Sequence, residues 1–446
     1  MINVLVVGGG AREHAICSAV KQSKNTRLYT VMSNSNPGIS RLASDYMIGR
    51  ETDVELVVEY AKSKGIDLAL IGPEAPLEKG LTDALLEADI KVCAPIRSAA
   101  RIETDKRWMR NLLEKYRIPG QVKFKVFDNP DDAALFIKDL GLSVAIKPIG
   151  LTGGKGVKVY GDHFNTLDEA MGYVRSVISE RIGGSPMVLV EEKMIGEEFT
   201  LQAFTDGSYL HPLPLVQDHK RLLPGDQGVN TGGMGSYSCP DGLLPFLSQS
   251  DYDEGVMILR RIVDALRSEG CAYTGPIYGQ FILTADGIRV IEVNARFGDP
   301  EAMNILPLLK SDYVDLCYAM IEGNLSRKKI RIDEKATVCK YVVPEGYGTR
   351  SIVDARIDVD EAGIKKTGAR LFYASVNMKD DGIYTTSSRS LAVLGVADTL
   401  TEAESICEKG LSFIHGDHIF IRHDIGTKEL IERRINHMRM LRGGAV

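Results

Sequence analysis

The sequence predicts a multidomain α/β and α+β protein that begins with a doubly wound parallel sheet. Three observations lead to this fold class. Strand and helix patterns alternate over about the first hundred residues, which is typical of a parallel sheet covered by helices. After Thr104 the alternation gives way to glycine loops and hairpins. The 446 residues are also enough for roughly three domains.

The N-terminal part reads as strand, glycine turn and helix over "INVLVVGGGAREHAICSAV". The segments "RLYTVMS", "DLALIGPEAP" and "KVCAP" are the next predicted strands, with helical patterns such as "DVELVVEYAKSKG" between them. Ligands of doubly wound sheets bind at the carboxyl ends of the strands. Gly8 to Gly10, Asn36 to Gly38 and Gly72 to Glu74 fall at those ends.

The first glycine turn matches a dinucleotide-binding fingerprint only in part. Gly8 and Gly10 occupy the first and third positions, but Glu13 takes the sixth, where glycine is expected. The acidic residue that would hold a ribose is also missing, because the second strand ends in "SNSN". The turn can still bring a small phosphate to the helix start, and a plain tight turn is the alternative.

The central part opens with "TDKRWMRNLLEKYRIPG", a helix capped by Thr104 or Asp105. The segment "SVAIKPIGLTGGKGVKVY" then reads as strand, glycine loop and strand. It is not a P-loop, because Gly156 follows Lys155 and strand formers follow in place of a helix. A glycine hairpin that carries lysines can fold over phosphates; an ordinary flexible hairpin is the alternative.

Two further central segments have weaker patterns. "SPMVLVEEKMIGEEFT" reads as an apolar strand and a connector, whose main chain suits a flat heterocycle, with a solvated acidic turn as the alternative. "LVQDHKRLLPGDQGVNTGGMGSYS" has little periodicity and several glycines. A long irregular loop in a compact domain is either functional or disordered.

The segment "YGQFILTADGIRVIEVNA" predicts a hairpin whose loop is "ADG", residues 285–287. With that loop Thr284 faces Ile288, and counting back in pairs places Gln280 opposite Glu292.

One face of this hairpin gathers polar side chains, because residues two apart on a strand share a face. Gln280, Glu292 and Asn294 lie on that face, and their oxygens are the hard ligands that magnesium prefers. Arg296 lies one step further on, where it can meet a phosphate or a carboxylate. An ordinary solvated strand face is the alternative.

Composition narrows the function classes. The net charge is −6, which provides no basic footprint for nucleic acid. No apolar run reaches the length of a membrane span, and Met1 leads directly into a strand, so a secretory signal is not expected. Seven scattered cysteines without a C-x-x-C pair predict buried thiols in a cytoplasmic protein. His415 and His418 lack companion ligands, and we interpret "HGDH" as an ordinary turn.

Together the motifs resemble the ATP-grasp ligases, and among them the phosphoribosylamine–glycine ligase family. The segments "GGGAREHAI", "NPG", "GPEAPL", "KPIGLTGGKGV", "EEKMIGEEFT", "NTGGMGSYS" and "IEVNARFGDPE" follow in the family's order. They span nearly the whole chain. The long "NTGGMG" and "NARFGDPE" segments are the specific ones.

The resemblance implies three domains: a Rossmann-like substrate domain over 1–104, an ATP-grasp domain of two subdomains over 105–326, and a small mixed domain over 327–446 that closes the site. It implies ATP-dependent joining of glycine to 5-phosphoribosylamine through glycyl phosphate, in a monomer or weak homo-oligomer that acts on small molecules and binds no nucleic acid or membrane. The basic helix "KELIERRINHMRMLR" is interpreted as a solvated terminal face, with a partner helix as the alternative.

The resemblance also implies which residues act. ATP would be bound by Lys106, Lys147, Lys155, Glu191, Glu192, Met194 and Glu198. The other substrates would meet Gly9, Gly10, Asn36, Pro37, Gly38, Glu74, Arg221 and Arg296. The reacting groups would be bordered by Asp218, Lys220 and Arg296. Mg²⁺, with Mn²⁺ as the alternative ion, would be bound by Gln280, Glu292 and Asn294.

The sequence departs from the family's pattern at three places. Many ATP-grasp enzymes have glutamate where Gln280 stands, Pro224 and Val229 replace a common aspartate and proline, and "IGLTGGKG" lacks the usual alanine and aspartate. Three rival hypotheses remain: an ATP-grasp ligase for a different acid or amine, a nucleotide-binding regulator without turnover, and a dehydrogenase.

Overall fold

The computed structural model describes residues 1–152 and 156–444. Its first part is a parallel sheet of order β3-β2-β1-β4-β5, as the alternation predicts. The strands are β1 (Ile2–Val7), β2 (Thr26–Met32), β3 (Asp45–Ile48), β4 (Leu68–Ile71) and β5 (Lys91–Val92). The helices are α1 (Ala11–Gln22), α2 (Pro37–Leu42), α3 (Val54–Ser63), α4 (Glu74–Glu78), α5 (Leu81–Glu87) and α6 (Arg97–Thr104). The sequence pattern misses β3, which is short, lies at the sheet edge and is only half-buried.

A small antiparallel sheet of order β6-β9-β7-β8 follows. Its elements are α7 (Lys106–Lys115), β6 (Phe124–Phe127), α8 (Pro130–Asp139), β7 (Val144–Pro148), β8 (Lys158–Val159), α9 (Leu167–Ser179), η1 (Ile182–Gly184) and β9 (Val188–Glu192). The side chain of Asp105 caps α7, as one of the two predicted caps. The predicted glycine hairpin is confirmed by the antiparallel pairing of β7 with β8. Lys155 lies outside the described residues.

A second antiparallel sheet has the order β11-β10-β16-β17. Its strands are β10 (Gly196–Thr205), β11 (Leu210–Pro212), β16 (Gly275–Thr284) and β17 (Gly287–Asn294). Around it lie α10 (Gln249–Ser268), α11 (Glu301–Ile305), η2 (Leu306–Leu308), α12 (Tyr313–Ile321) and η3 (Leu325–Arg327). The acidic segment after β9, expected as a connector, therefore becomes the start of β10.

The β16–β17 hairpin reaches the predicted pairing by a different route. Thr284 pairs with Gly287, so the loop has two residues and the predicted three-residue loop is wrong. The register then shifts by one residue between Gln280 and Phe281, which leaves Ile291 as the extra residue of β17. This β-bulge restores the predicted pair of Gln280 with Glu292.

The last part forms a sheet of order β12-β15-β18-β23-β20 with β25 on β18, and a separate sheet of order β21-β22-β19-β24. The strands are β12 (Gln217–Asp218), β15 (Gly235–Ser238), β18 (Ala336–Pro344), β19 (Arg356–Val359), β20 (Arg370–Tyr373), β21 (Val376–Lys379), β22 (Gly382–Thr385), β23 (Leu391–Ala397), β24 (Ile414–His415) and β25 (Ile419–Ile421). The helices are α13 (Glu361–Lys366), α14 (Leu400–Leu411) and α15 (Lys428–Leu441). The sheet joins β15 to the C-terminal strands.

The glycine-rich stretch 215–238 is more ordered than its sequence indicates. It contains β12, β15 and a separate hairpin of β13 (Arg221–Leu223) with β14 (Gln227–Asn230). The expectation of an irregular loop is therefore wrong for much of this stretch. Its short strands carry too few apolar residues to produce a periodic pattern.

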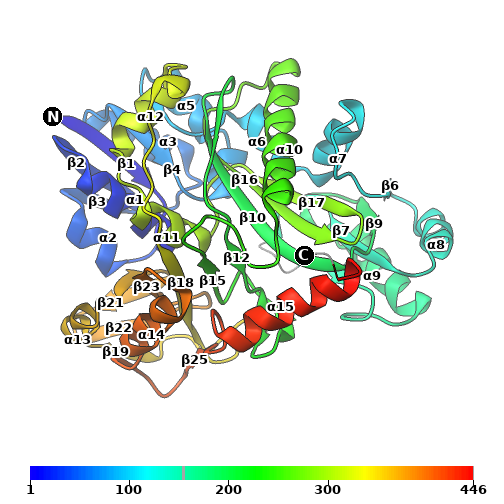
Figure 1. The fold of residues 1–446 in the computed structure, drawn as a ribbon. Coiled ribbons are helices and arrows are strands. Elements are labelled where there is room, and N and C mark those ends of the chain that lie inside the picture. The colour runs from blue at the N-terminus through cyan, green and yellow to red at the C-terminus, as the bar shows by residue number, and fades with distance from the viewer. Residues whose placement is uncertain (153–155, 445–446) are drawn as a thin grey trace.

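Figure 1 shows the blue N-terminal sheet above the orange C-terminal sheets, with α11 between them. That helix packs on α1 on one side and on β15 and β18 on the other. The red helix α15 leaves the C-terminal part and lies along β10 and β16. Among the residues with assigned structure, no helix is both long and apolar enough to cross a membrane.

Asn36 joins the N-terminal sheet to the C-terminal part. Its side-chain amide donates to the carbonyl oxygens of Gly9, Tyr373 and Ala374 at 2.8 to 3.0 Å. Its side-chain oxygen accepts from the first turn of α2, which it caps. Because the residue is fully buried, none of these groups has water as an alternative partner.

We expect Asn36→Ala to lower the free energy of unfolding by about 2–4 kcal/mol. The variant loses the cap of α2 and leaves the buried carbonyl oxygens without their hydrogen-bond donor. Urea midpoints at constant temperature measure the effect. Asn34→Ala is the control, because its amide bonds Val376 from a half-buried position and should cost less. Equal midpoints for the two variants would contradict this account of the joint.

Candidate functional site

A cleft of about 580 Å³ lies where the three parts meet. Both antiparallel sheets, the end of the N-terminal sheet and the C-terminal part supply its walls. The predicted residues that line it are Glu74, Lys106, Lys147, Glu192, Met194, Glu198, Asp218, Lys220, Arg221, Gln280, Glu292, Asn294 and Arg296. Most of the predicted site residues therefore gather in one cleft, although they are spread over more than two hundred positions of the sequence.

The polar face of β16 and β17 forms one wall, as predicted. Asn294 donates its amide to Glu292 at 3.3 Å, so their side chains lie together. Gln280 donates its amide to Glu198 at 2.6 Å and accepts from the Tyr278 hydroxyl. Burial alone would raise the pKa of Glu292, but the charges of Lys220 and Lys106 outweigh burial and lower it. The Glu292 carboxylate is therefore ionised, and its oxygens can act as metal ligands.

The donor set suits a hard divalent cation. One carboxylate and two amide oxygens meet on this wall, and magnesium takes such ligands while it keeps water and phosphate oxygens as further ligands. Within residues 1–152 and 156–444, no group of three His, Cys, Asp or Glu side chains has the spacing of a metal site. A metal would therefore depend on the amide oxygens and on substrate phosphates.

The small sheet and the helix α7 each contribute a lysine to the cleft. Lys147, on β7, pairs with Glu191 at 2.6 Å. Lys106, at the start of α7, donates to the carbonyl oxygen of Gly150 at 2.9 Å. Both residues line the cleft, and their charges contribute to lowering the pKa of Glu292 on the other sheet. Cations placed near such a carboxylate suit a bound triphosphate and its metal ion.

Arg110 connects the two walls. The sequence pattern does not identify it as a site residue. Its guanidinium binds both oxygens of Glu191, at 2.6 and 3.1 Å. It also donates to the carbonyl oxygens of Val290 and Ile291, at the β17 bulge. Arg110 is fully buried on the amphipathic helix α7, where nothing in the pattern distinguishes it from a surface arginine.

Glu191 itself does not line the cleft. Its side chain is 1% exposed and lies between Arg110 and Lys147. Burial would raise the pKa of Glu191, but these two cations hold it at about 2. Any contact of this residue with a nucleotide would come from its main chain, and the roles of Glu192, Met194 and Glu198 in binding ATP stay predictions.

Arg296 lies at the inner end of the cleft between two carboxylates. It contacts Glu74 at 3.3 Å and Glu103 at 2.7 Å. Burial would raise the pKa of Glu74, but Arg296 and Arg12 hold it at about 2. Burial raises the pKa of Glu103 to about 7 although Arg296 opposes the shift. The sequence pattern does not identify Glu103 or Arg12 as site residues, because neither stands in an alternating pattern.

Asp218 and Lys220 lie on the same side of the cleft as Glu301. Burial, and then the charge of Glu301, raise the pKa of Asp218. Lys220 contacts Glu198 at 3.4 Å, and Arg221 reaches Asp162 at 2.6 Å. Glu301 belongs to the quoted "NARFGDPE" segment, so a signal for it was present in the sequence.

Glu13 occupies the cradle of the first glycine turn. Its carboxylate accepts from the Gly10 amide at 2.8 Å and from Arg12 at 2.6 Å. A side chain at Gly8 or Gly72 would approach Glu13 to 2.6 or 2.1 Å. The place where a dinucleotide phosphate would approach thus already holds a carboxylate, in agreement with the weak fingerprint.

The other residues near this turn are used in the structure itself. Gly9, Gly10, Asn36, Pro37 and Gly38 lie outside the cleft lining. Their substrate-binding role stays a prediction.

The C-terminal part contributes Arg389 to the cleft. The sequence pattern does not identify this arginine as a site residue either. It donates to the carbonyl oxygens of Gly232 and Asp299 at 2.5 and 2.9 Å, and it lies over the ring of Tyr341. It therefore fixes the "NTGGMG" segment against the cleft.

Two antiparallel sheets that enclose a cleft, with lysines on one wall and a carboxylate–amide face on the other, define a protein of the ATP-grasp class. Family models described as the N, ATP-grasp (A) and C domains of phosphoribosylglycinamide synthetase match residues 2–103, 104–302 and 337–428. The chain belongs to the phosphoribosylglycinamide synthetase family.

Individual relatives agree with this assignment. The phosphoribosylamine–glycine ligase of Methanothermobacter thermautotrophicus is 52% identical over 441 residues, covering 99% of this chain and 100% of the relative. The crystal structure of the same-named Thermotoga maritima protein is 25% identical with a TM-score of 0.80, covering 95% of this chain and all of that one. The biotin carboxylase domain of Hydrogenobacter thermophilus 2-oxoglutarate carboxylase, 16% identical with a TM-score of 0.73 over 99% of this chain and 95% of that one, shares the fold.

We expect Glu191→Gln to destabilise the protein in a pH-dependent way. A carboxyl with a lowered pKa stabilises the folded state above its unfolded pKa, and this contribution is lost as pH falls toward the folded value of about 2. The difference in unfolding free energy between wild type and variant should therefore shrink by about 2 kcal/mol from pH 7 to pH 3. Urea titrations across this range measure it. Glu180→Gln, at an exposed site of the same subdomain, is the control, and a pH-independent difference would contradict the assignment.

Proposed function

We propose that the cleft joins glycine to 5-phosphoribosylamine with cleavage of ATP, giving glycinamide ribonucleotide, ADP and phosphate, a step of purine biosynthesis. The observation that supports this most is that Lys106 and Lys147 line the same cleft as the Gln280–Glu292–Asn294 wall. The family's ATP-grasp domain uses ATP, and the curated relatives are named for this ligation.

A carboxylate is a poor electrophile for an amine, so it is first phosphorylated. The glycine carboxylate attacks the γ-phosphate of ATP, and the bond to ADP breaks to give glycyl phosphate. The amine of phosphoribosylamine then attacks that carbonyl carbon, and phosphate leaves. Phosphoryl transfer needs positioning and charge neutralisation more than a protein nucleophile.

The residues of the cleft are suited to these tasks. Lys106 and Lys147 would hold the phosphates, with Lys155 as a further predicted contact, and Glu198 would meet the ribose hydroxyls. Glu292, Gln280 and Asn294 would hold Mg²⁺, which supplies neutralisation of the phosphate charge when bound. Mn²⁺ is the alternative ion.

At the inner end of the cleft, Arg296 would bind an anionic substrate group. Glu74 and Glu103 fix its guanidinium from two sides. Asp218, Lys220 and Arg221 would border the reacting groups. Each of these cations already has an acidic partner, so its position is set before a substrate arrives.

Glycyl phosphate hydrolyses in water, so the site requires a cover. The C-terminal part supplies one wall through Arg389, which supports the proposal that residues 327–446 close the site over the parts formed by 1–104 and 105–326. The cysteines have no disulfide partners, and six of the seven are buried. These thiols suit a reducing compartment, and we propose the cytoplasm.

The first test measures phosphate release from ATP by the purified chain. We expect release only when glycine and phosphoribosylamine are both present, because the second step consumes the intermediate of the first. Release with a different acid or amine would favour another ATP-grasp ligase. ATP binding without release would favour a regulator.

The second test addresses the metal wall. Glu292→Gln and Asn294→Ala should each lower magnesium-dependent ADP formation by about a hundredfold or more, because they remove oxygen ligands, while the melting temperature changes little. Glu254→Gln, at a half-buried position of α10 outside the cleft lining, is the control and should keep wild-type turnover. Retained turnover in both site variants would count against this wall as the metal site.

A further inference from the structure

The β13–β14 hairpin lies at the cleft without the support of a larger sheet. It is two-stranded, and among the described strands none extends it. A lone hairpin is marginally stable in water, so its position must be set by side-chain contacts. Arg221, Asp226 and Asn230 of this hairpin all line the cleft.

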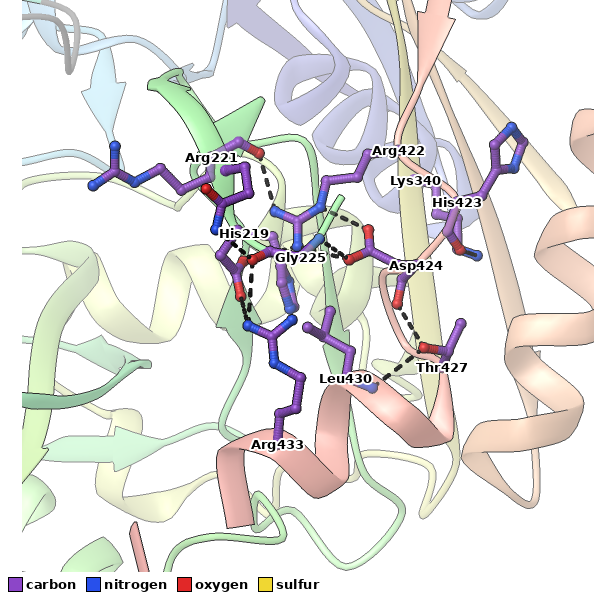
Figure 2. Close-up of polar contacts among 12 residues, drawn as sticks. His219, Arg221, Gly225, Lys340, Arg422, His423, Asp424, Thr427, Leu430 and Arg433 are labelled. Carbon is purple, nitrogen blue, oxygen red and sulfur yellow. Dashed lines mark hydrogen bonds and ion pairs between the residues drawn. The ribbon is translucent and has the colours of Figure 1, made fainter. Parts of the chain in front are cut away.

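The C-terminal segment holds the turn of the hairpin. Asp226, which has a left-handed backbone (φ +61°), accepts from Arg422 at 2.8 Å and from Arg434 at 2.7 Å. The neighbouring Gly225 amide donates to Asp424 at 2.8 Å. Figure 2 shows Arg422 between Arg221 and Asp424, with α15 approaching from the other side through Leu430 and Arg433.

The groups that hold the turn are themselves fixed. The Arg422 side chain is fully buried and follows β25, which pairs with β18. Lys340, also buried on β18, donates to the carbonyl oxygen of His423 at 2.6 Å. Thr427 caps the start of α15. The expectation that this basic helix presents a solvated face is therefore wrong for Arg434, whose charge is used inside the protein.

The same contacts extend to the nucleotide side of the cleft. Arg434 binds Glu197 at 3.0 Å, next to the predicted ribose contact Glu198. Lys220, which directly precedes the hairpin, pairs with Glu198. Across the cleft Arg221 pairs with Asp162 of the small subdomain. A shift of the turn would move all three of these contacts.

His219 does not compete with Arg422 and Arg434 for the carboxylate of Asp226. It is buried beside the two arginines, and burial, followed by the charges of Arg434 and Arg422, lowers its pKa to about 3. The imidazole is therefore neutral at physiological pH, and Asp226 is the acid that both arginines bind.

We propose that Asp226 is a positioning residue through which the C-terminal clamp sets the affinity of the cleft for ATP. The C-terminal clamp is our name for Arg422, Asp424 and Arg434. The inference rests on the proposed function, since it concerns the same nucleotide. The clamp makes no predicted contact with ATP; it acts by fixing the turn of the hairpin and, through Arg434, Glu197 beside the predicted ribose contact Glu198.

The test compares Asp226→Asn and Arg434→Gln with wild type in the full chain. We expect each to raise the KM for ATP about tenfold while kcat at saturating ATP and the KM for glycine change less than about twofold. Arg434→Lys, which keeps the charge that binds Asp226, should recover most of the affinity. Lys428→Gln makes the same change of charge at an exposed site of α15 and is the matched control.

Calorimetry with a non-hydrolysable ATP analogue and Mg²⁺ separates this proposal from the proposed function. Wild type that binds the analogue but releases no phosphate would overturn the function, and the clamp would still be judged on Kd. The double variant Asp226→Asn/Arg434→Gln should bind more tightly than the two single effects together would predict, because the two side chains share one contact. An unchanged Kd and KM, or a fall in kcat alone, would overturn the clamp. If Asp226→Asn does not fold, the pair Arg434→Lys and Arg434→Gln decides.

Discussion

The buried contact of Arg110 with Glu191 is the interaction on which the cleft depends. Arg110 holds the β17 bulge by two carbonyl oxygens and Glu191 by both carboxylate oxygens, while Glu191 in turn holds Lys147. One guanidinium thus fixes the distance between the wall that would bind metal and the wall that would bind phosphate. A charge this deep is tolerated only because every nearby donor and acceptor is paired.

The sequence predicts the walls better than the link between them. Gln280, Glu292 and Asn294 are recognisable because strand alternation places them on one face and their oxygens share a chemistry. Arg110 gives no such signal, since a charged residue on an amphipathic helix is usually solvated. The predicted pair of Gln280 with Glu292 was reached through a wrong three-residue loop, and the bulge at Ile291 compensated for it. Periodicity identifies faces, but a bulge depends on the tertiary contacts that stabilise it.

The N-terminal sheet shows why a fold does not fix a ligand. Its strand order and glycine turn are those of dinucleotide-binding proteins, yet Glu13 replaces a glycine and its carboxylate occupies the turn. Gly8 and Gly72 leave the space that this side chain fills. The replacement of a glycine by Glu13, which is visible in the sequence, therefore fills the turn with a carboxylate. The volume and the charge of this side chain argue against the dinucleotide hypothesis.

The pairing of charges in the cleft also bears on how it would receive a triphosphate. A carboxylate contacts each of three cations in the cleft, Lys147, Lys220 and Arg296. This contact restricts the rotamers that each side chain can adopt and keeps it from moving onto a neighbouring group. An incoming polyanion then meets cations that are already placed, and less conformational entropy is lost on binding. The acids make the site less positive, and Glu74, Glu103 and Glu198 line the cleft together with the cations that they bind. Affinity in such a site is limited by how firmly each pair is held. Contacts of residues that are not predicted to bind the nucleotide, such as Arg110 and the C-terminal clamp, are therefore expected to influence it.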